Sequence, residues 1–242
     1  MSFSPNPRAW AQIDLQALHG NLQRARELHP DKSIVAVIKA NAYGHGMTEI
    51  AASLKQNPDG AEVLAVATMD EVIALQLQGT GKRLLLLGGF RNADELRFLL
   101  EAGIEFVIHA DYQLALLKSR IRDNPRSRFS VWLKADTGMH RLGMTAEEIA
   151  AALEFLVACS QTSRVIVMSH LACVDSDDPD AAAVTALQVS RFQDIVAAAR
   201  QLQDKRIEFS LSASAGILAR TDLGFDYIRP GIMLYGGSPF AD

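Results

Sequence analysis

The sequence predicts a (β/α)8 barrel of the TIM type in a single large domain. Eight short apolar runs, rich in Val, Ile, Leu and Phe, recur along the 242 residues with little polar alternation, as in parallel strands covered on both faces. Helical patterns separate these runs, and the length is ordinary for such a barrel. The predicted strands are Ile34–Lys39, Val63–Val66, Arg83–Leu87, Glu105–Ile108, Ser130–Leu133, Val165–Met168, Glu208–Leu211 and Asp226–Ile228.

Capping signals mark the helices that precede and connect these strands. A first helix is expected from Leu15 to about His29, with Asp14 as its N-cap and apolar residues at helical spacing. Three later helices begin with an N-cap residue and a glutamate three positions on, the spacing of a capping box. These pairs are Thr68 with Glu71, Asn92 with Glu95, and Thr145 with Glu148.

An open doubly wound sheet is the alternative arrangement of the same elements. Such a sheet usually carries a glycine-rich phosphate turn, G-x-G-x-x-G, after its first strand. Here the first strand leads into Lys39 and then into the sequence NAYGHG, which does not fit that pattern. The barrel is therefore favoured over the open sheet.

Composition excludes several classes of protein. The formal net charge is −4, and no basic cluster indicates nucleic-acid binding. No apolar run approaches the roughly 20 residues of a membrane helix, and the first ten residues lack the apolar core of a secretory signal. Cys159 and Cys173 lie far apart, without metal-ligand spacing. We therefore expect a cytoplasmic protein without a metal that binds a small molecule and neither nucleic acid nor a membrane.

Chemically active side chains follow the predicted strands, at the ends where barrel active sites lie. Lys39 comes directly after the apolar residues 36–38, although a lysine is rarely buried without a partner. Lysines in partly apolar, cation-rich pockets can form Schiff bases. Hydroxyl residues and glycines after the seventh and eighth strands are typical of a barrel phosphate site. A Schiff-base lysine opposite a phosphate site indicates pyridoxal phosphate.

Each of these residues also has an ordinary structural explanation. Lys39 could be solvated, and Arg141 could pair with Asp136 or with a surface carboxylate. Packing, capping or turn formation would equally account for Tyr43, His170, Ser212 and Ser214. Their joint occurrence at successive strand ends, without a carboxylate pair or a metal cluster, favours the site.

Three motifs, in this order and at these distances, closely resemble alanine racemase. They are AVIKANAYGHG at 36–46, KADTGMHRLG at 134–143 and IRPGIMLYG at 228–236, and the resemblance runs from about residue 10 to the last residue. The family implies a pyridoxal-phosphate barrel followed by a β-rich second domain. It also implies interconversion of L- and D-alanine, for peptidoglycan supply or alanine catabolism, by a homodimer.

The resemblance assigns the residues that act on the substrate and on the cofactor ring. Lys39 matches the lysine that binds the cofactor covalently and acts as the base on D-alanine. Arg141 matches the arginine that reaches the cofactor's phenolic oxygen and helps to hold the substrate carboxylate. Lys134 matches a lysine that is carbamylated in some members, which would give Arg141 an anionic partner. His170 matches a histidine beside the arginine that faces the pyridine nitrogen, and that arginine matches Arg229.

The resemblance also assigns the residues that bind the cofactor phosphate. Tyr43, in NAYG, matches a tyrosine that contacts the phosphate. Ser214 and the backbone of Gly231 and Ile232 match the phosphate cradle. Ala213 stands where many relatives have an asparagine.

The family pattern divides the chain into three parts. Residues 1–13 would pair with the sheet of the second domain, 14–236 form the barrel, and 237–242 begin the linker to that domain. The second domain supplies a tyrosine base for the other face of the substrate and a second phosphate tyrosine, and neither maps onto this sequence. We therefore expect little activity from this chain alone.

Three rival functions stay open from the sequence. The first is a single-domain barrel that binds pyridoxal phosphate for homeostasis without racemising an amino acid. The second is a decarboxylase of the same barrel type, and the third is a barrel without catalytic activity in which Lys39 is solvated.

Overall fold

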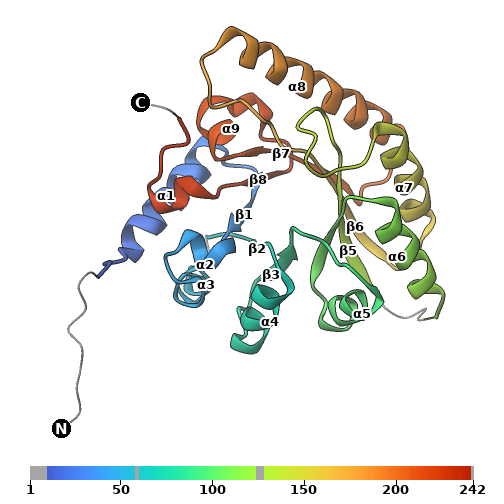
Figure 1. Cartoon of the computed structure of the whole chain (residues 1–242), viewed down its shortest axis with the longest axis horizontal. Helices are drawn as coiled ribbons and strands as arrows, with labels where there is room; N and C mark the ends of the chain where they lie inside the picture. The colour runs from blue at the N-terminus through green and yellow to red at the C-terminus, as the bar shows by residue number, and fades with distance from the viewer. Residues whose placement is uncertain (1–9, 58–59, 124–127, 241–242) are drawn as a thin grey trace.

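The protein is a closed barrel of eight parallel strands (Figure 1). The structure is a computed structural model, and it describes residues 10–57, 60–123 and 128–240. The strands follow one another around the barrel in chain order, and β8 pairs with β1 to close it. Their bounds are β1 Ser33–Val37, β2 Val63–Val66, β3 Arg83–Leu86, β4 Glu105–Ile108, β5 Phe129–Lys134, β6 Thr162–Met168, β7 Ile207–Ala213 and β8 Tyr227–Arg229. The predicted fold class is confirmed.

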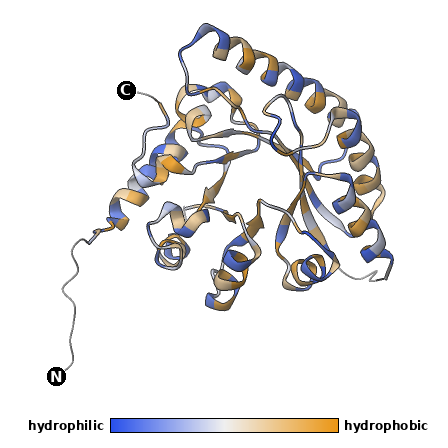
Figure 2. Cartoon of the chain, in the orientation of Figure 1, coloured by the Kyte–Doolittle hydropathy of each residue, from blue (hydrophilic) through white to orange (hydrophobic). Residues whose placement is uncertain are grey.

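Helices surround the strands and turn their apolar sides toward them (Figures 1 and 2). Helix α1 precedes the first strand, and each later strand is followed by at least one helical segment. The α-helices are α1 Leu15–Leu28, α2 Lys39–Tyr43, α3 Met47–Gln56, α4 Met69–Gln78, α5 Ala93–Ala102, α6 Asp111–Asp123, α7 Ala146–Ala158, α8 Pro179–Arg200 and α9 Ser214–Ala219. The short 3-10 helices are η1 Thr221–Leu223 and η2 Ile232–Tyr235.

The predicted caps are present, with one difference. The Asp14 carboxylate accepts hydrogen bonds from the first turn of α1, and Thr68 and Thr145 form complete capping boxes with their glutamates. Asn92 caps α5, but the Glu95 carboxylate turns back to the Arg91 N–H, so that box is not closed.

The first strand is shorter than predicted. It ends at Val37, and Lys39 begins α2. The N–H of Ile38 still donates to Ala65 O at 2.9 Å. Beyond that point the backbone enters the left-handed region, so the ladder cannot continue and Lys39 is turned away from the strand direction.

Two apolar cores hold the barrel together. The larger lies between the strands and the surrounding helices, and the smaller fills the barrel itself. In the smaller core the rings of Trp132 and Tyr227 meet edge to face, with centroids 5.2 Å apart. Both side chains are fully buried, so packed side chains separate the two ends of the barrel.

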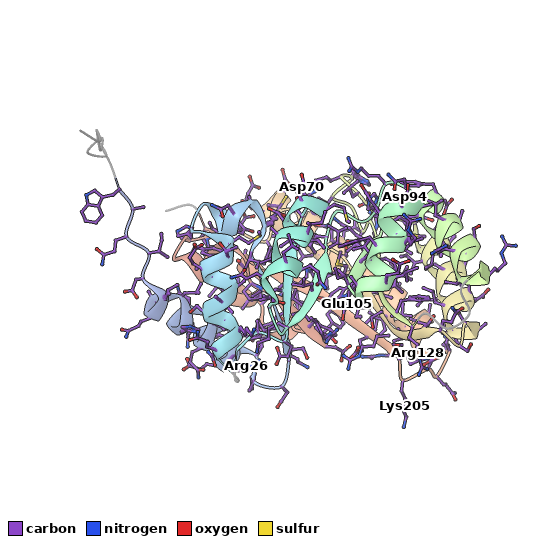
Figure 3. All side chains as sticks on the ribbon, turned by 90° about the horizontal axis from the view of Figure 1, so that it is seen from below. Arg26, Asp70, Asp94, Glu105, Arg128 and Lys205 are labelled. Carbon is purple, nitrogen blue, oxygen red and sulfur yellow. The ribbon has the colours of Figure 1, made fainter. Side chains whose placement is uncertain are left out.

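The two ends of the barrel can be identified by labelled side chains. Figure 3 shows Asp70 and Asp94, near the starts of α4 and α5, along one edge of the barrel, and Arg26, Arg128 and Lys205 along the opposite edge. Because α4 and α5 start just after β2 and β3, the Asp70 edge is the carboxyl end of the strands.

The predicted N-terminal segment lies partly outside the described residues, which begin at 10. Residues 10–14 form no strand, and Trp10 is 79% exposed. Within the described part of the chain, no helix combines the length and the hydropathy that crossing a membrane requires.

Candidate active site

A cavity of about 500 Å³ opens at the carboxyl end of the barrel. Strand ends and the loops that follow them form its wall, as expected for a barrel active site. All nine predicted site residues line it: Lys39, Tyr43, Lys134, Arg141, His170, Ser214, Arg229, Gly231 and Ile232. Ser212 does not line the cavity, because its hydroxyl is buried and donates to Leu223 O at 2.9 Å.

A left-handed turn places Lys39 and Tyr43 in this cavity. Residues 40–43 all have φ between 52° and 54°. This conformation costs non-glycine residues about 1–2 kcal/mol each, so neighbouring groups must hold it. Asn41 helps, because its side-chain oxygen accepts the Met47 N–H at 2.8 Å and so caps α3. Gly44, at φ 88°, ends the turn.

Glu71 ties this turn to the next βα unit. Its carboxylate accepts the N–H of Ala40 at 2.6 Å and also the N–H groups of Ala67 and Thr68 at 2.8 and 3.2 Å. One side chain therefore closes the capping box of α4 and fixes the backbone directly after Lys39. The capping signal predicted the bond from the Thr68 N–H, but the contact with Ala40 depends on the tertiary fold.

Glu71→Ala is expected to slow and weaken covalent capture of a carbonyl cofactor at Lys39, because the left-handed turn loses one of its supports. The matched control is Glu148→Ala, which removes the same capping-box position from α7 without touching the lysine segment. Both variants should lose about 0.5–2 kcal/mol of stability. The measurement is the rate of borohydride-trapped pyridoxyl incorporation, and equal rates in the two variants would contradict the positioning role of Glu71.

Arg229 is buried, lines the cavity and has no acidic partner among the described residues. Its guanidinium donates to Ser210 Oγ and Ser169 O, both at 2.5 Å, and to Leu211 O at 3.0 Å. No carboxylate of a described residue lies within 4 Å of it. Burial lowers the pKa of Arg229 to about 10, so it stays protonated at neutral pH.

Four cationic side chains share the cavity: Lys39, Lys134, Arg141 and Arg229. Burial, together with the charges of Arg229, Lys134, Arg141 and Lys39, lowers the pKa of His170 to about 3. His170 is therefore neutral at physiological pH. An anionic ligand would compensate this concentration of positive charge.

The pKa of Lys134 is also lowered by burial and by neighbouring positive charges. Burial first, and then the neighbouring Arg141 and Arg229, lower the pKa of its ammonium group to about 8. At pH 7 about a tenth of this side chain is therefore an uncharged amine, which can act as a nucleophile.

We expect Lys134 to react with an amine-directed reagent with a midpoint near pH 8, and the exposed Lys205 serves as the reference lysine. Because the folded protein binds the proton more weakly than the unfolded chain, stability should rise as the pH increases from about 8 toward the usual lysine pKa. Mass-spectrometric labelling across this pH range measures both lysines in one sample. Identical profiles for the two lysines would contradict the expectation.

The opposite wall of the cavity gathers a hydroxyl group and backbone N–H groups. Ser214 Oγ accepts the N–H of Gly231 at 3.0 Å and that of Met233 at 3.3 Å. A Cβ on Gly231 would lie 2.5 Å from the Tyr43 hydroxyl oxygen, so glycine lets that hydroxyl approach the backbone. The Tyr235 ring packs 5.1 Å from the Tyr43 ring and supports it.

Arg141 and Asp136 do not form the pair that was considered from the sequence. The Asp136 carboxylate accepts the N–H groups of Gly138 and His140 and contacts the His140 ring. Although burial alone raises the pKa of Asp136, these hydrogen bonds hold it below its usual value. Glycine at position 143 lets the end of the loop pass close to its start, since a Cβ there would lie 2.6 Å from Asp136 N. Asp136 thus shapes the loop, and Arg141 lines the cavity.

A buried glutamine on α8, which the sequence did not signal, fixes the loops after β5 and β6. Gln188 donates to His170 O at 3.1 Å and to Thr137 Oγ1 at 3.4 Å, and its oxygen accepts the Ala172 N–H at 2.9 Å. The loops that carry Arg141 and His170 are thereby joined to one helix.

Comparison with known proteins agrees with this geometry. The family model "Alanine racemase, N-terminal domain" matches residues 13–239. The alanine racemase of Shewanella sediminis is 42% identical over 238 residues, which cover 98% of this chain and 62% of that protein.

Solved structures of similar proteins share the fold. The alanine racemase of Acinetobacter baumannii has a TM-score of 0.83 at 34% identity, covering 95% of this chain and 60% of that one. The Bartonella henselae alanine racemase, with covalently bound pyridoxal phosphate, has a TM-score of 0.80 at 26% identity and covers 95% of this chain and 61% of that one. The chain thus spans about 60% of the length of these relatives, and it belongs to the family of alanine racemase N-terminal domains.

Proposed function

We propose that this chain is the pyridoxal-phosphate-binding barrel of an alanine racemase. One observation supports this above the others. A single cavity places a lysine at one wall, a buried arginine without a carboxylate partner at its base, and a hydroxyl with converging backbone N–H groups at another wall. These are the features that an aromatic aldehyde bearing a phosphate group requires.

The residues present fit that cofactor. Lys39 would bind its aldehyde carbon covalently, and Ser214, Tyr43 and the N–H of Gly231 would hold its phosphate. Arg229 would face the pyridine nitrogen. The bound cofactor would supply an electron sink that acidifies the Cα proton of an amino acid.

Three side chains of the protein would act on the cofactor ring and on the substrate. Arg229 stays protonated at neutral pH, so it would donate to the ring nitrogen of a bound cofactor without giving up its proton. Arg141 would hold the substrate carboxylate near Lys39. The Lys39 amine would remove or return the Cα proton on one face of the substrate, which makes it the base for D-alanine.

Lys134 would form an ion pair with Arg141 once it is carbamylated. Its uncharged amine adds to CO2, a proton is released, and the product is an anionic carbamate. The cation beside Arg141 would thus become an anion that pairs with it. The lowered pKa of Lys134, at about 8, supports this proposal.

The base that acts on the other face of the substrate would come from outside the 242 residues of this chain. Tyr43 is the single tyrosine among the described residues of the cavity wall, and it lies beside Gly231 on the phosphate side. In this proposal residues 14–236 are the barrel, 1–13 pair with a second domain, 237–242 lead into it, and two copies complete each other's sites as a homodimer.

Borohydride trapping tests the proposal directly. The chain is incubated with pyridoxal phosphate and reduced, and the modified peptide is mapped by mass spectrometry. A stable pyridoxyl group on Lys39 in the native chain, and its absence there in Lys39→Arg, is the expected result. Random labelling of exposed lysines, or none at all, would refute the cofactor and also exclude the homeostasis barrel. Inversion of alanine by a homodimer that also carries the proposed second domain then separates a racemase from that alternative.

A further inference from the structure

A chain of hydrogen bonds between buried side chains runs from α8 to the end of β5. Gln188 Nε2 donates to Thr137 Oγ1 at 3.4 Å, and Thr137 Oγ1 lies 2.8 Å from Ser169 Oγ. Ser169 Oγ donates to Ala135 O at 2.9 Å, so Thr137 is the donor in the middle bond. The three side chains are only 1–2% exposed. All the bonds therefore run in one direction, and each strengthens the next.

The amide of Gln188 also holds the loop that follows β6. Its Nε2 donates to His170 O at 3.1 Å, and its Oε1 accepts the N–H of Ala172 at 2.9 Å. Neither Gln188 nor Thr137 lines the cavity, so neither is placed to touch a ligand there. These two side chains can affect the site only through the residues that they hold.

The two loops joined in this way carry side chains of the cavity. Arg141 follows Thr137 by four residues, and His170 comes directly after Ser169. The guanidinium of Arg229 is attached to the same point, because it donates to Ser169 O. Moving either loop therefore changes where these side chains lie relative to one another.

We propose that Gln188 is a positioning residue that sets where Arg141 lies relative to His170 and Arg229. This role rests on the proposed function, in which Arg141 holds the carboxylate of the substrate. A displacement of about 1 Å in an active site can cost about 10²-fold in rate. The amide thus acts on substrate binding from outside the cavity.

The first test needs no cofactor. The pH midpoint of Lys134 labelling reports the surroundings of this amine, because burial and the charges of Arg141 and Arg229 lower its pKa to about 8. Gln188→Met keeps the length of the side chain and removes all its hydrogen bonds. Arg141 should then move away and water should enter, which raises the midpoint by about one pH unit.

Phe192→Leu is the matched control. Phe192 is fully buried about one turn further along α8, and its ring packs against Phe225 with centroids 5.1 Å apart. The substitution should lower stability without altering the loops. The labelling midpoint of Lys134 should therefore stay near 8, even where the Tm falls as far as in Gln188→Met.

The loaded chain gives a second readout, the deuterium exchange of D-alanine. In Gln188→Met the KM for D-alanine should rise about tenfold, while kcat should stay within about twofold of the native value. Lys39 is unaffected because Glu71 supports its turn separately. A general loss of stability does not divide KM from kcat in this way.

A milder pair of variants keeps the test decisive if Gln188→Met does not fold. Thr137→Val preserves the shape of the side chain and removes only the hydroxyl that joins Gln188 to Ser169. It should shift the Lys134 midpoint and the KM in the same direction. Thr137→Ser keeps a hydroxyl and should restore the native values.

An unchanged midpoint and KM in folded Gln188→Met, or in Thr137→Val where the first variant does not fold, would overturn the proposal. Equal changes in Phe192→Leu would overturn it too. If pyridoxal phosphate is not trapped at Lys39, the proposed function fails, but labelling of Lys134 in the unloaded chain still decides whether Gln188 positions the loops. The two proposals therefore fail separately.

Discussion

Loaded with pyridoxal phosphate, the 242-residue chain is expected to exchange the Cα hydrogen of D-alanine with solvent far faster than it converts D-alanine to L-alanine. Exchange needs a base on one face of the substrate only, and Lys39 lines the cavity to supply it. Inversion needs a second group on the other face. A positioned acid or base contributes about 10²–10⁴-fold to a proton transfer, so inversion should lag behind exchange by a factor of that order.

The measurement compares two rates in deuterated water. Mass spectrometry follows deuterium uptake into D-alanine, and chiral chromatography follows the appearance of L-alanine. Lys39→Arg should lose both activities. Equal rates of exchange and inversion would show that these residues hold the second base. Asp175 would then be the first residue to replace, because it is the exposed carboxylate that lines the cavity.

The second large effect concerns stability. Arg229→Glu is expected to lower the free energy of unfolding by about 3–5 kcal/mol, the cost of leaving a buried charge without compensation. The native guanidinium donates to Ser169 O, Leu211 O and Ser210 Oγ. A carboxylate there would face two carbonyl oxygens and could donate to neither. Such a variant therefore tests folding before it tests the chemistry of the cofactor ring.

Urea denaturation of Arg229→Glu and of Arg97→Glu, a surface substitution with the same change in charge, measures this cost. Arg97 is half-exposed on α5, so its variant should stay within about 0.5 kcal/mol of the native chain. Arg229→Gln, which keeps one amide donor, should fall between the two. A change below about 1 kcal/mol in Arg229→Glu would mean that the surroundings of Arg229 rearrange or hydrate easily.

The strand pattern was predictable because it depends on local composition. Each β-strand is a short apolar run, and the Asp14, Thr68 and Thr145 caps follow from spacing alone. The region of the site was predictable because the carboxyl ends of parallel strands in a barrel must converge, and the resemblance to alanine racemase selected the individual residues there. Knowing which residue ends each strand is then enough to place Lys39 and Arg229 on one cavity.

The backbone turn after Lys39 and the choice between Ser212 and Ser214 depend on contacts between distant segments. Ala40 and Ala42 have no intrinsic preference for the left-handed region, so no local signal announced the turn after Lys39. The two serines Ser212 and Ser214 are equivalent by pattern. In the structure the Ser212 hydroxyl donates to Leu223 O, and Ser214 is the one that lines the cavity.

The left-handed turn after Lys39 also depends on segments that are made at different times during synthesis. Glu71 emerges soon after the turn, with α4, whereas Tyr235, whose hydroxyl donates to Val37 O, emerges only after β8. The full set of contacts around Lys39 is therefore present only once β8 has paired with β1. If the chain binds pyridoxal phosphate as proposed, we expect capture at Lys39 to require a completed barrel.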